Sequence, residues 1–155
     1  MSSLKVLIFA PVDEMGESDE KLKNAGCELV LGEASWHNPQ GDNEDQMHRM
    51  AQGAVALKGT SIRSSPISRK IIESSPDLRI IAKYTIGVDD VDVAAATENG
   101  VLVTHSPTES NWGGVAEGTM TMMLSALKKT RERDQAMKQG LWRDSDLQGT
   151  YLGRR

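Results

Sequence analysis

The chain has 155 residues, a formal net charge of −4 and 26% charged residues, which is typical of a soluble protein with one domain, or one domain and part of a second. Lysine and arginine are scattered, so nothing favours nucleic-acid binding, and the single cysteine, Cys27, excludes an internal disulfide. The sequence has no run of about 20 apolar residues and no signal-peptide pattern at its start, so we expect a cytoplasmic protein that does not enter a membrane.

Short apolar runs alternate with amphipathic segments in the first two thirds of the chain. Because parallel strands need helical crossovers, this alternation predicts a doubly wound, flavodoxin-like α/β domain with a five-stranded parallel sheet in the order 2-1-3-4-5. We expect Asn43 to cap the second helix and Asp89 to cap the fourth. The expected strands are 4–10, 27–31, 54–57, 78–82 and 101–104, and the expected helices are 14–25, 44–52, one opened by residues 64–68 that ends near residue 74, and 91–98.

Two histidines and three acids lie close together in the polar region around the second helix. They are His37, Asp42, Glu44, Asp45 and His48. Imidazole and carboxylate groups bind metals, but this spacing matches no known ligand pattern. Surface residues are the preferred interpretation, and a metal site is the minor alternative.

The strand expected at 78–82 leads into a turn, residues 83–90, directly before a helix. Doubly wound sheets bind ligands at the carboxyl ends of their strands. Gly87 would let backbone N–H groups approach an anion, so the turn is a candidate receptor for a carboxylate or a phosphate. From the pattern alone, an ordinary strand-to-helix loop is the preferred interpretation.

The sequence changes character after Pro107. Residues 108–114 predict a hinge-like loop, and residues 115 to about 139 contain no proline and predict one long helix. At about 100° per residue its apolar side chains cover about 200° of the circumference, which is about twice what packing on one domain requires. We therefore expect a second surface on this helix, with homodimer contacts from residues 115–137 that include Val115, Met120, Met122, Met123, Leu124 and Leu127.

A series of short motifs runs through the second half of the sequence. They are Leu78-Arg79-Ile80-Ile81-Ala82-Lys83-Tyr84, Gly87-Val88-Asp89-Asp90-Val91-Asp92, Ala94-Ala95-Ala96, Asn99-Gly100-Val101, Ser106-Pro107, Asn111 and Val115-Ala116-Glu117. In this order and spacing the chain resembles the D-isomer-specific 2-hydroxyacid dehydrogenases of the phosphoglycerate dehydrogenase and formate dehydrogenase type. The resemblance is strong from residue 54 to residue 127 and more general elsewhere.

The resemblance implies a substrate domain, residues 1–107, followed by a hinge and an interdomain helix that begins the NAD-binding domain and helps to form a homodimer, residues 108–155. It implies NAD as the cofactor of the family and a small 2-hydroxy or 2-keto acid as the substrate. Backbone N–H groups of the loop after the fourth strand would bind the substrate carboxylate, and an asparagine would bind its reacting end. The implied site residues are Thr85, Ile86, Gly87 and Asn111, with Gly59 and Thr60 lining the same cleft.

Two local departures from the family pattern fall in this loop. Thr85 stands where many members have glycine, and Asp90 stands where asparagine or histidine is usual. The loop could therefore be narrower than in other members, or the substrate different.

The end of the chain departs further from the family. Residues 147–153 resemble the approach to the Gly-x-Gly-x-x-Gly turn, but that motif does not occur in the sequence, and the family's catalytic arginine, glutamate and histidine have no counterpart. His105 has no evident carboxylate beside it and is not expected to replace that histidine. We therefore expect a truncated dehydrogenase that neither binds NAD nor is active alone, with no catalytic residues of its own.

Two other functions fit parts of the sequence. The chain could be a non-catalytic, self-associating domain that binds a small carboxylate or a partner subunit, as the two-sided helix suggests. A response-regulator-like domain has the same size, but it needs a lysine after the fifth strand, where this chain has Thr104-His105-Ser106-Pro107.

Overall fold

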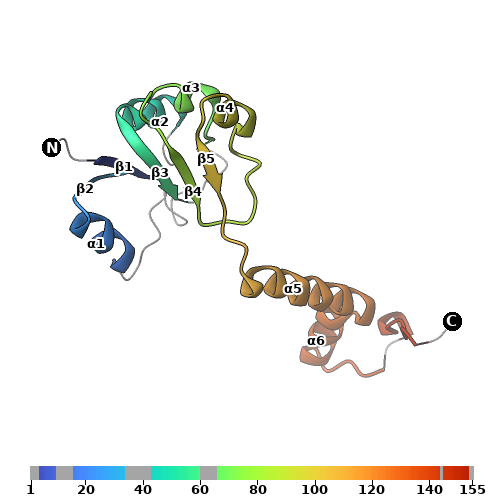
Figure 1. Cartoon of the computed structure of the whole chain (residues 1–155). Coiled ribbons are helices and arrows are strands. Elements are labelled where there is room, and N and C mark those ends of the chain that lie inside the picture. Colours follow the sequence, from blue (N-terminus) through green and yellow to red (C-terminus); the bar gives the residue numbers. More distant parts are fainter. Residues whose placement is uncertain (1–3, 10–15, 34–42, 60–65, 144, 154–155) are drawn as a thin grey trace. The chain divides into compact units, whose positions relative to one another are not determined.

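The computed structural model describes residues 4–9, 16–33, 43–59, 66–143 and 145–153 (Figure 1). Internal contacts divide the chain into two units, Met1–Pro107 and Thr108–Arg155, and each unit is described by itself. Among the described residues, no helix combines the length and the apolar character that crossing a membrane requires.

The first unit is built on a five-stranded parallel sheet in the order β2-β1-β3-β4-β5, which confirms the predicted fold class and strand order. Helices connect the strands, as parallel pairing requires. The strands are β1 (Leu4–Phe9), β2 (Cys27–Leu31), β3 (Ala54–Gly59), β4 (Ile80–Lys83) and β5 (Leu102–Thr104), and the helices are α1 (Glu17–Asn24), α2 (Glu44–Ala51), α3 (Arg69–Ile72) and α4 (Val93–Glu98).

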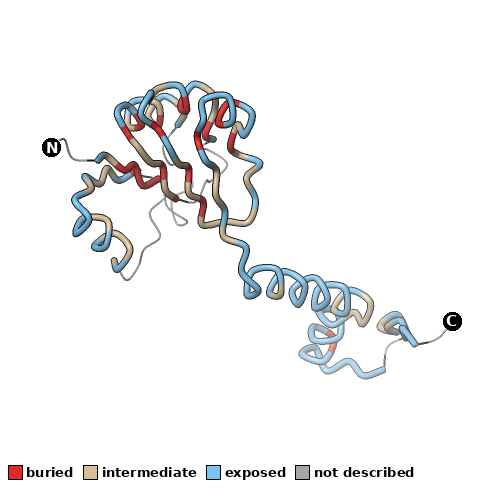
Figure 2. The backbone as a smooth tube through the Cα atoms, in the orientation of Figure 1, coloured by how far each residue is buried: buried red, intermediate tan, exposed pale blue. Residues whose placement is uncertain are grey.

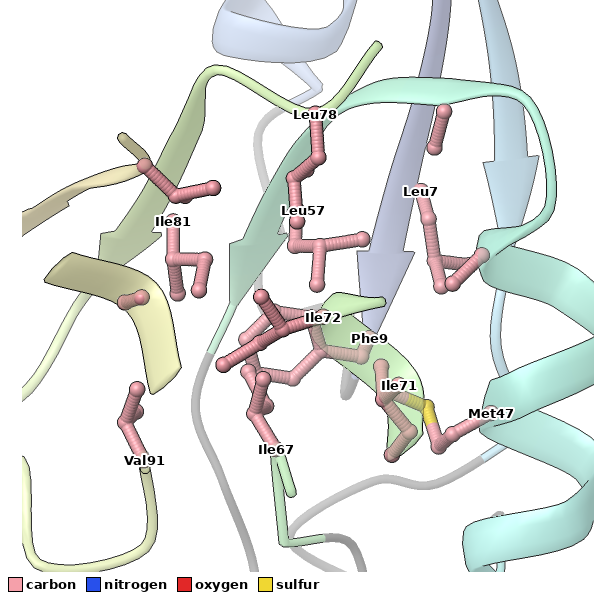
Figure 3. Packing of buried hydrophobic residues seen from close by; sticks show 14 of the residues in the cluster. Leu7, Phe9, Met47, Leu57, Ile67, Ile71, Ile72, Leu78, Ile81 and Val91 are labelled. Carbon is pink, nitrogen blue, oxygen red and sulfur yellow. The ribbon is translucent and has the colours of Figure 1, made fainter. Parts of the chain in front are cut away.

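The hydrophobic core lies on one face of this sheet, under α2, α3 and α4 (Figures 1 and 3). Side chains alternate between the faces of a strand, so every second strand residue points into this core. Buried residues of the helices close it from the other side. The largest members are Leu7, Phe9, Met47, Leu57, Ile67, Ile71, Ile72, Leu78 and Ile81.

The helix caps agree with the sequence in one case and differ in another. Asn43 caps α2 as expected, because its side chain accepts a hydrogen bond from Gln46 N at 3.0 Å while the Gln46 side chain accepts one from Asn43 N. The prediction that Asp89 caps α4 is wrong. Asp89 lies in a turn, and α4 begins after Asp92, whose carboxylate accepts from Ala95 N at 2.8 Å.

The second unit contains α5 (Glu109–Lys128), α6 (Thr130–Lys138) and a short 3-10 helix, η1 (Ser145–Leu147). The predicted hinge-like loop at 108–114 is wrong, because α5 already begins after Thr108, whose backbone is extended. The predicted single helix from 115 to about 139 is wrong as well. The chain breaks at Lys129, which takes a left-handed conformation with φ of 52°.

Hydrogen bonds from a later segment accompany this break. Thr150 N donates to Leu127 O at 2.8 Å, the Lys128 ammonium donates to Thr150 O at 2.6 Å, and Arg133 Nε donates to Leu147 O at 2.9 Å. These contacts satisfy a carbonyl at the end of α5. The helical periodicity of the sequence contains no information on such contacts, so it does not predict the break at Lys129.

Candidate functional site

The receptor loop, residues 84–89, follows β4 at the carboxyl edge of the sheet, as the sequence predicts. Its three central carbonyl groups are occupied: Thr85 O accepts from Ser106 N at 3.1 Å, Ile86 O accepts from His105 Nδ1 at 3.0 Å, and Gly87 O accepts from Thr85 Oγ1 at 3.0 Å. Within the described part of the chain, the backbone N–H groups of Thr85, Ile86 and Gly87 donate to no other group. The loop therefore holds three donors for an external acceptor.

An ion pair between a buried lysine and a half-buried aspartate joins the two ends of the receptor loop. Lys83, at the end of β4, is only 3% exposed, and its Nζ lies 2.5 Å from both carboxylate oxygens of Asp90. Ser106 Oγ also donates to Lys83 O at 3.0 Å. In the sequence, Asp90 stands out only as a departure from the family pattern. A lysine at the end of an apolar strand, followed within a few residues by an acid just before the next helix, is the sequence pattern that indicates such a pair.

Gly59 lies beside the receptor loop at the end of β3. Its carbonyl accepts from Tyr84 N at 3.0 Å, and it pairs with Phe9 on one side and Lys83 on the other. Its φ is +155°, and a Cβ at this position would lie 1.8 Å from Phe9 O. Only glycine fits here. The other expected cleft residue, Thr60, lies outside the described residues.

Lys58 connects α1 to the same edge of the sheet. Its Nζ lies 2.7 Å from Ser18 Oγ, 3.2 Å from Asp19 Oδ1 and 5.4 Å from the centre of the Tyr84 ring. Burial acts to lower the pKa of Lys58, but Tyr84 and Asp19 together outweigh it and raise this pKa. Lys58 is therefore charged at neutral pH. Tyr84 Oη is buried and, among the described side chains, has no hydrogen-bond partner.

The remaining expected site residues belong to the second unit. Asn111 lies in the first turn of α5, where it is exposed. No residue of α5 is buried, and Figure 2 shows this helix exposed along most of its length. Of the six expected dimer residues, Leu127 is half-buried. The other five, Val115, Met120, Met122, Met123 and Leu124, are between 40% and 69% exposed.

The described acids and histidine of the polar region around α2 are engaged with protein groups. His48 Nδ1 lies 3.1 Å from Lys70 O, and Asp45 Oδ1 lies 2.5 Å from Lys70 Nζ. Glu44 accepts a hydrogen bond from Ser68. Among the described residues, no three His, Cys, Asp or Glu side chains lie close enough to hold a metal. His37 and Asp42 are outside the described residues.

Comparison with known proteins shows the family. A family model described as D-isomer specific 2-hydroxyacid dehydrogenase, catalytic domain, matches residues 6–139. The chain belongs to this family. The D-3-phosphoglycerate dehydrogenase of Archaeoglobus fulgidus is 26% identical over 149 residues, which are 96% of this chain and 26% of that protein. The resemblance inferred from the motifs is thereby confirmed.

Solved structures of 2-hydroxyacid dehydrogenases and related proteins share the fold. The TT0316 protein from Thermus thermophilus superimposes with a TM-score of 0.70 at 26% identity, covering 96% of this chain and 46% of that one. An NAD-dependent formate dehydrogenase from Staphylococcus aureus, in complex with NAD, has a TM-score of 0.72 at 21% identity, covering 93% and 44%. The chain thus spans about a quarter of the curated relative and less than half of these solved chains.

NAD is the cofactor of the 2-hydroxyacid dehydrogenase family. A dinucleotide is held by a strand, a Gly-x-Gly-x-x-Gly turn and the N-terminus of the following helix. The sequence lacks that motif, and residues 108–143 and 145–153 form helices and turns without a strand. The described residues therefore do not fit NAD.

Proposed function

We propose that this chain provides the substrate-binding part of an NAD-dependent D-2-hydroxyacid dehydrogenase, an oxidoreductase that acts on the CH–OH group of a small 2-hydroxy acid. In this proposal residues 85–87 bind the substrate carboxylate. The observation that carries it is the set of three N–H groups that, among the described residues, have no acceptor, in residues whose own carbonyl groups are all occupied. Hydrogen bonds from N–H groups to an ionised carboxylate stabilise it by about 1.5–3 kcal/mol each.

Family membership supports further residues in substrate binding. Gly59 keeps the end of β3 free of a side chain next to the loop. Thr60, outside the described residues, is proposed as a further substrate-binding residue on family membership alone. Asn111 would donate its side-chain amide to the hydroxyl or keto oxygen of the substrate. Family membership supports these roles, because the matched region includes all three residues.

Carboxylate binding by the loop is testable by NMR. In a titration of the isotope-labelled 155-residue chain with pyruvate, we expect the amide signals of Thr85, Ile86 and Gly87 to shift in a saturable way. The dissociation constant should be in the millimolar range, which corresponds to a binding free energy of about −4 kcal/mol, because the ligand is small. Pyruvamide, which lacks the carboxylate, is the control and should leave these signals unchanged. Equal shifts with both ligands, or shifts only elsewhere, would contradict the proposal.

The 155-residue chain alone should not catalyse hydride transfer. Because the described residues do not fit a nicotinamide dinucleotide, we expect NADH fluorescence to be unchanged by the protein and no NADH oxidation in the presence of pyruvate or glyoxylate. A full-length member of the family serves as the positive control under the same conditions. NADH binding at micromolar concentration would contradict this prediction and show a nucleotide site that the described residues do not reveal.

The alternative, a self-associating domain, is favoured by one specific observation. Five apolar side chains of α5 are between 40% and 69% exposed, and exposed apolar surface of this kind is typical of protein–protein interfaces. We propose that they form a homodimer interface and that this interface exists whether or not the chain takes part in catalysis.

Self-association should depend on the methionines of α5. We expect a dimer at micromolar concentration and at least a 100-fold weaker dimer for Met122→Glu combined with Met123→Glu, because each change places a charge in an apolar interface. Light scattering after size-exclusion chromatography measures the mass. Gln135→Glu, at an exposed position of α6, is the matched control. A wild-type chain that is monomeric at micromolar concentration would contradict the proposed interface.

A further inference from the structure

The receptor loop is bounded by two oppositely charged residues that bind each other. Lys83 precedes the loop and Asp90 follows it, and both Asp90 oxygens lie 2.5 Å from Lys83 Nζ. The loop is therefore closed at its base by side chains as well as by the sheet. Neither residue is among the expected substrate contacts.

Each partner of the ion pair also has hydrogen bonds to other parts of the first unit. Lys83 is the last residue of β4, and its carbonyl accepts from Ser106 Oγ. Asp90 is tied to Ile67, which is fully buried: Ile67 N donates to Asp90 O at 2.8 Å, and Asp92 N donates to Ile67 O at 2.9 Å. The ion pair thus joins the end of β4 to the segment that is hydrogen-bonded to Ile67. It thereby fixes the distance between the first and last residues of the loop.

The charge of Asp90 is unexpected beside a receptor for anions. A carboxylate near the loop repels a bound carboxylate and partly cancels the attraction of Lys83. An electrostatic role for this pair would therefore favour a neutral residue at position 90. A geometric role explains the acid, because only an ionised side chain binds the buried ammonium with both oxygens.

We propose that the Lys83–Asp90 ion pair positions the receptor loop, so that the N–H groups of residues 85–87 are preorganised for the substrate carboxylate. Lys83 and Asp90 are positioning residues and do not touch the substrate. This inference rests on the proposed function of the loop. Preorganisation increases affinity because less conformational entropy is lost on binding.

The variant Asp90→Asn distinguishes the two roles by the sign of its effect. It keeps one oxygen acceptor and the shape of the side chain but removes the negative charge. If the pair positions the loop, pyruvate should bind about fivefold more weakly. The hydrogen-bonded amides that hold the loop, Tyr84 N on Gly59 O and Ser106 N on Thr85 O, should exchange with deuterium about tenfold faster. If Lys83 acts through its charge, pyruvate should bind more tightly. Asp45→Asn, in the exposed pair with Lys70, makes the same charge change and should alter neither quantity.

Two further variants cover the possibility that Asp90→Asn does not fold. Lys83→Arg retains the charge pair and should retain most of the affinity. The double variant Lys83→Met with Asp90→Leu replaces both charges by apolar groups, which buried pairs often tolerate, and should fold with weakened pyruvate binding. A folded double variant that binds pyruvate as the wild type does would overturn the inference.

The outcomes separate this inference from the proposed function. If the wild-type chain shows no loop shifts with pyruvate, the carboxylate receptor is wrong and the positioning role falls with it. If the wild type binds and Asp90→Asn binds equally or more tightly, the receptor stands and the positioning role is wrong. Weaker binding with faster amide exchange, at an unchanged Asp45→Asn control, supports both.

Discussion

Replacing Asp90 with alanine is expected to lower the free energy of unfolding by about 3–5 kcal/mol. The change removes the carboxylate that binds Lys83, while the Lys83 ammonium stays in a place where it is only 3% exposed. The buried ammonium is then less well compensated than in the wild type, where Asp90 adds to the other interaction of Lys83. Urea unfolding followed by far-ultraviolet circular dichroism measures the effect.

Two controls separate this effect from a general loss of charge. Adding Lys83→Met to Asp90→Ala removes the buried ammonium and should restore most of the lost stability, to within about 2 kcal/mol of the wild type. Asp45→Ala breaks the exposed pair with Lys70 and should cost less than about 1 kcal/mol. A cost for Asp90→Ala as small as that for Asp45→Ala would show that Lys83 is solvated in solution and that the pair is not buried.

Replacing Gly59 with alanine should lower the free energy of unfolding by about 3 kcal/mol or more. The new Cβ would lie 1.8 Å from Phe9 O, and a φ of +155° is unfavourable for any residue with a side chain. The strands β1 and β3 must therefore move apart at their carboxyl ends. Because Gly59 O accepts from Tyr84 N, the amide signals of the receptor loop should shift in the same variant.

Gly100→Ala is the matched control for this prediction. Gly100 also has a positive φ, +67°, but a Cβ there would meet nothing within 4 Å. Gly100→Ala should lower the free energy of unfolding by about 1 kcal/mol, because alanine is less stable than glycine in a left-handed backbone conformation. The difference between the two variants in thermal or urea unfolding then measures the clash with β1. Equal losses of unfolding free energy in the two variants would show that β1 and β3 accommodate the new Cβ without strain.

Much of the first unit could be predicted from the sequence. The strand order followed from the number of alternating units, because parallel strands need crossovers and leave few arrangements. Asn43 was identified as a cap because the capping interaction is local, within four residues. The turn after β4 was placed correctly because a strand end shortly before a helix is visible in the pattern of apolar residues.

Features that depend on contacts between distant residues were not predictable in the same way. The left-handed Lys129 that ends α5 is accompanied by hydrogen bonds from residues near position 150, and no periodicity encodes those. The capping role of Asp92 instead of Asp89 depends on the turn at residues 88–91, where Val91 N donates to Val88 O and Ile67 binds the backbone on both sides of Val91.

The sequence by itself determined the α/β class, the strand order and the family, because hydrophobic periodicity, turn residues and motif spacing are properties of nearby residues. Only the tertiary structure decided which groups complete the site. It paired Lys83 with Asp90, set His105 and Ser106 on the carbonyl side of the loop, and left three N–H groups of the loop without acceptors among the described residues. Hydrogen bonds and ion pairs act over a few ångströms, so they depend on how the folded strands and loops bring these residues together.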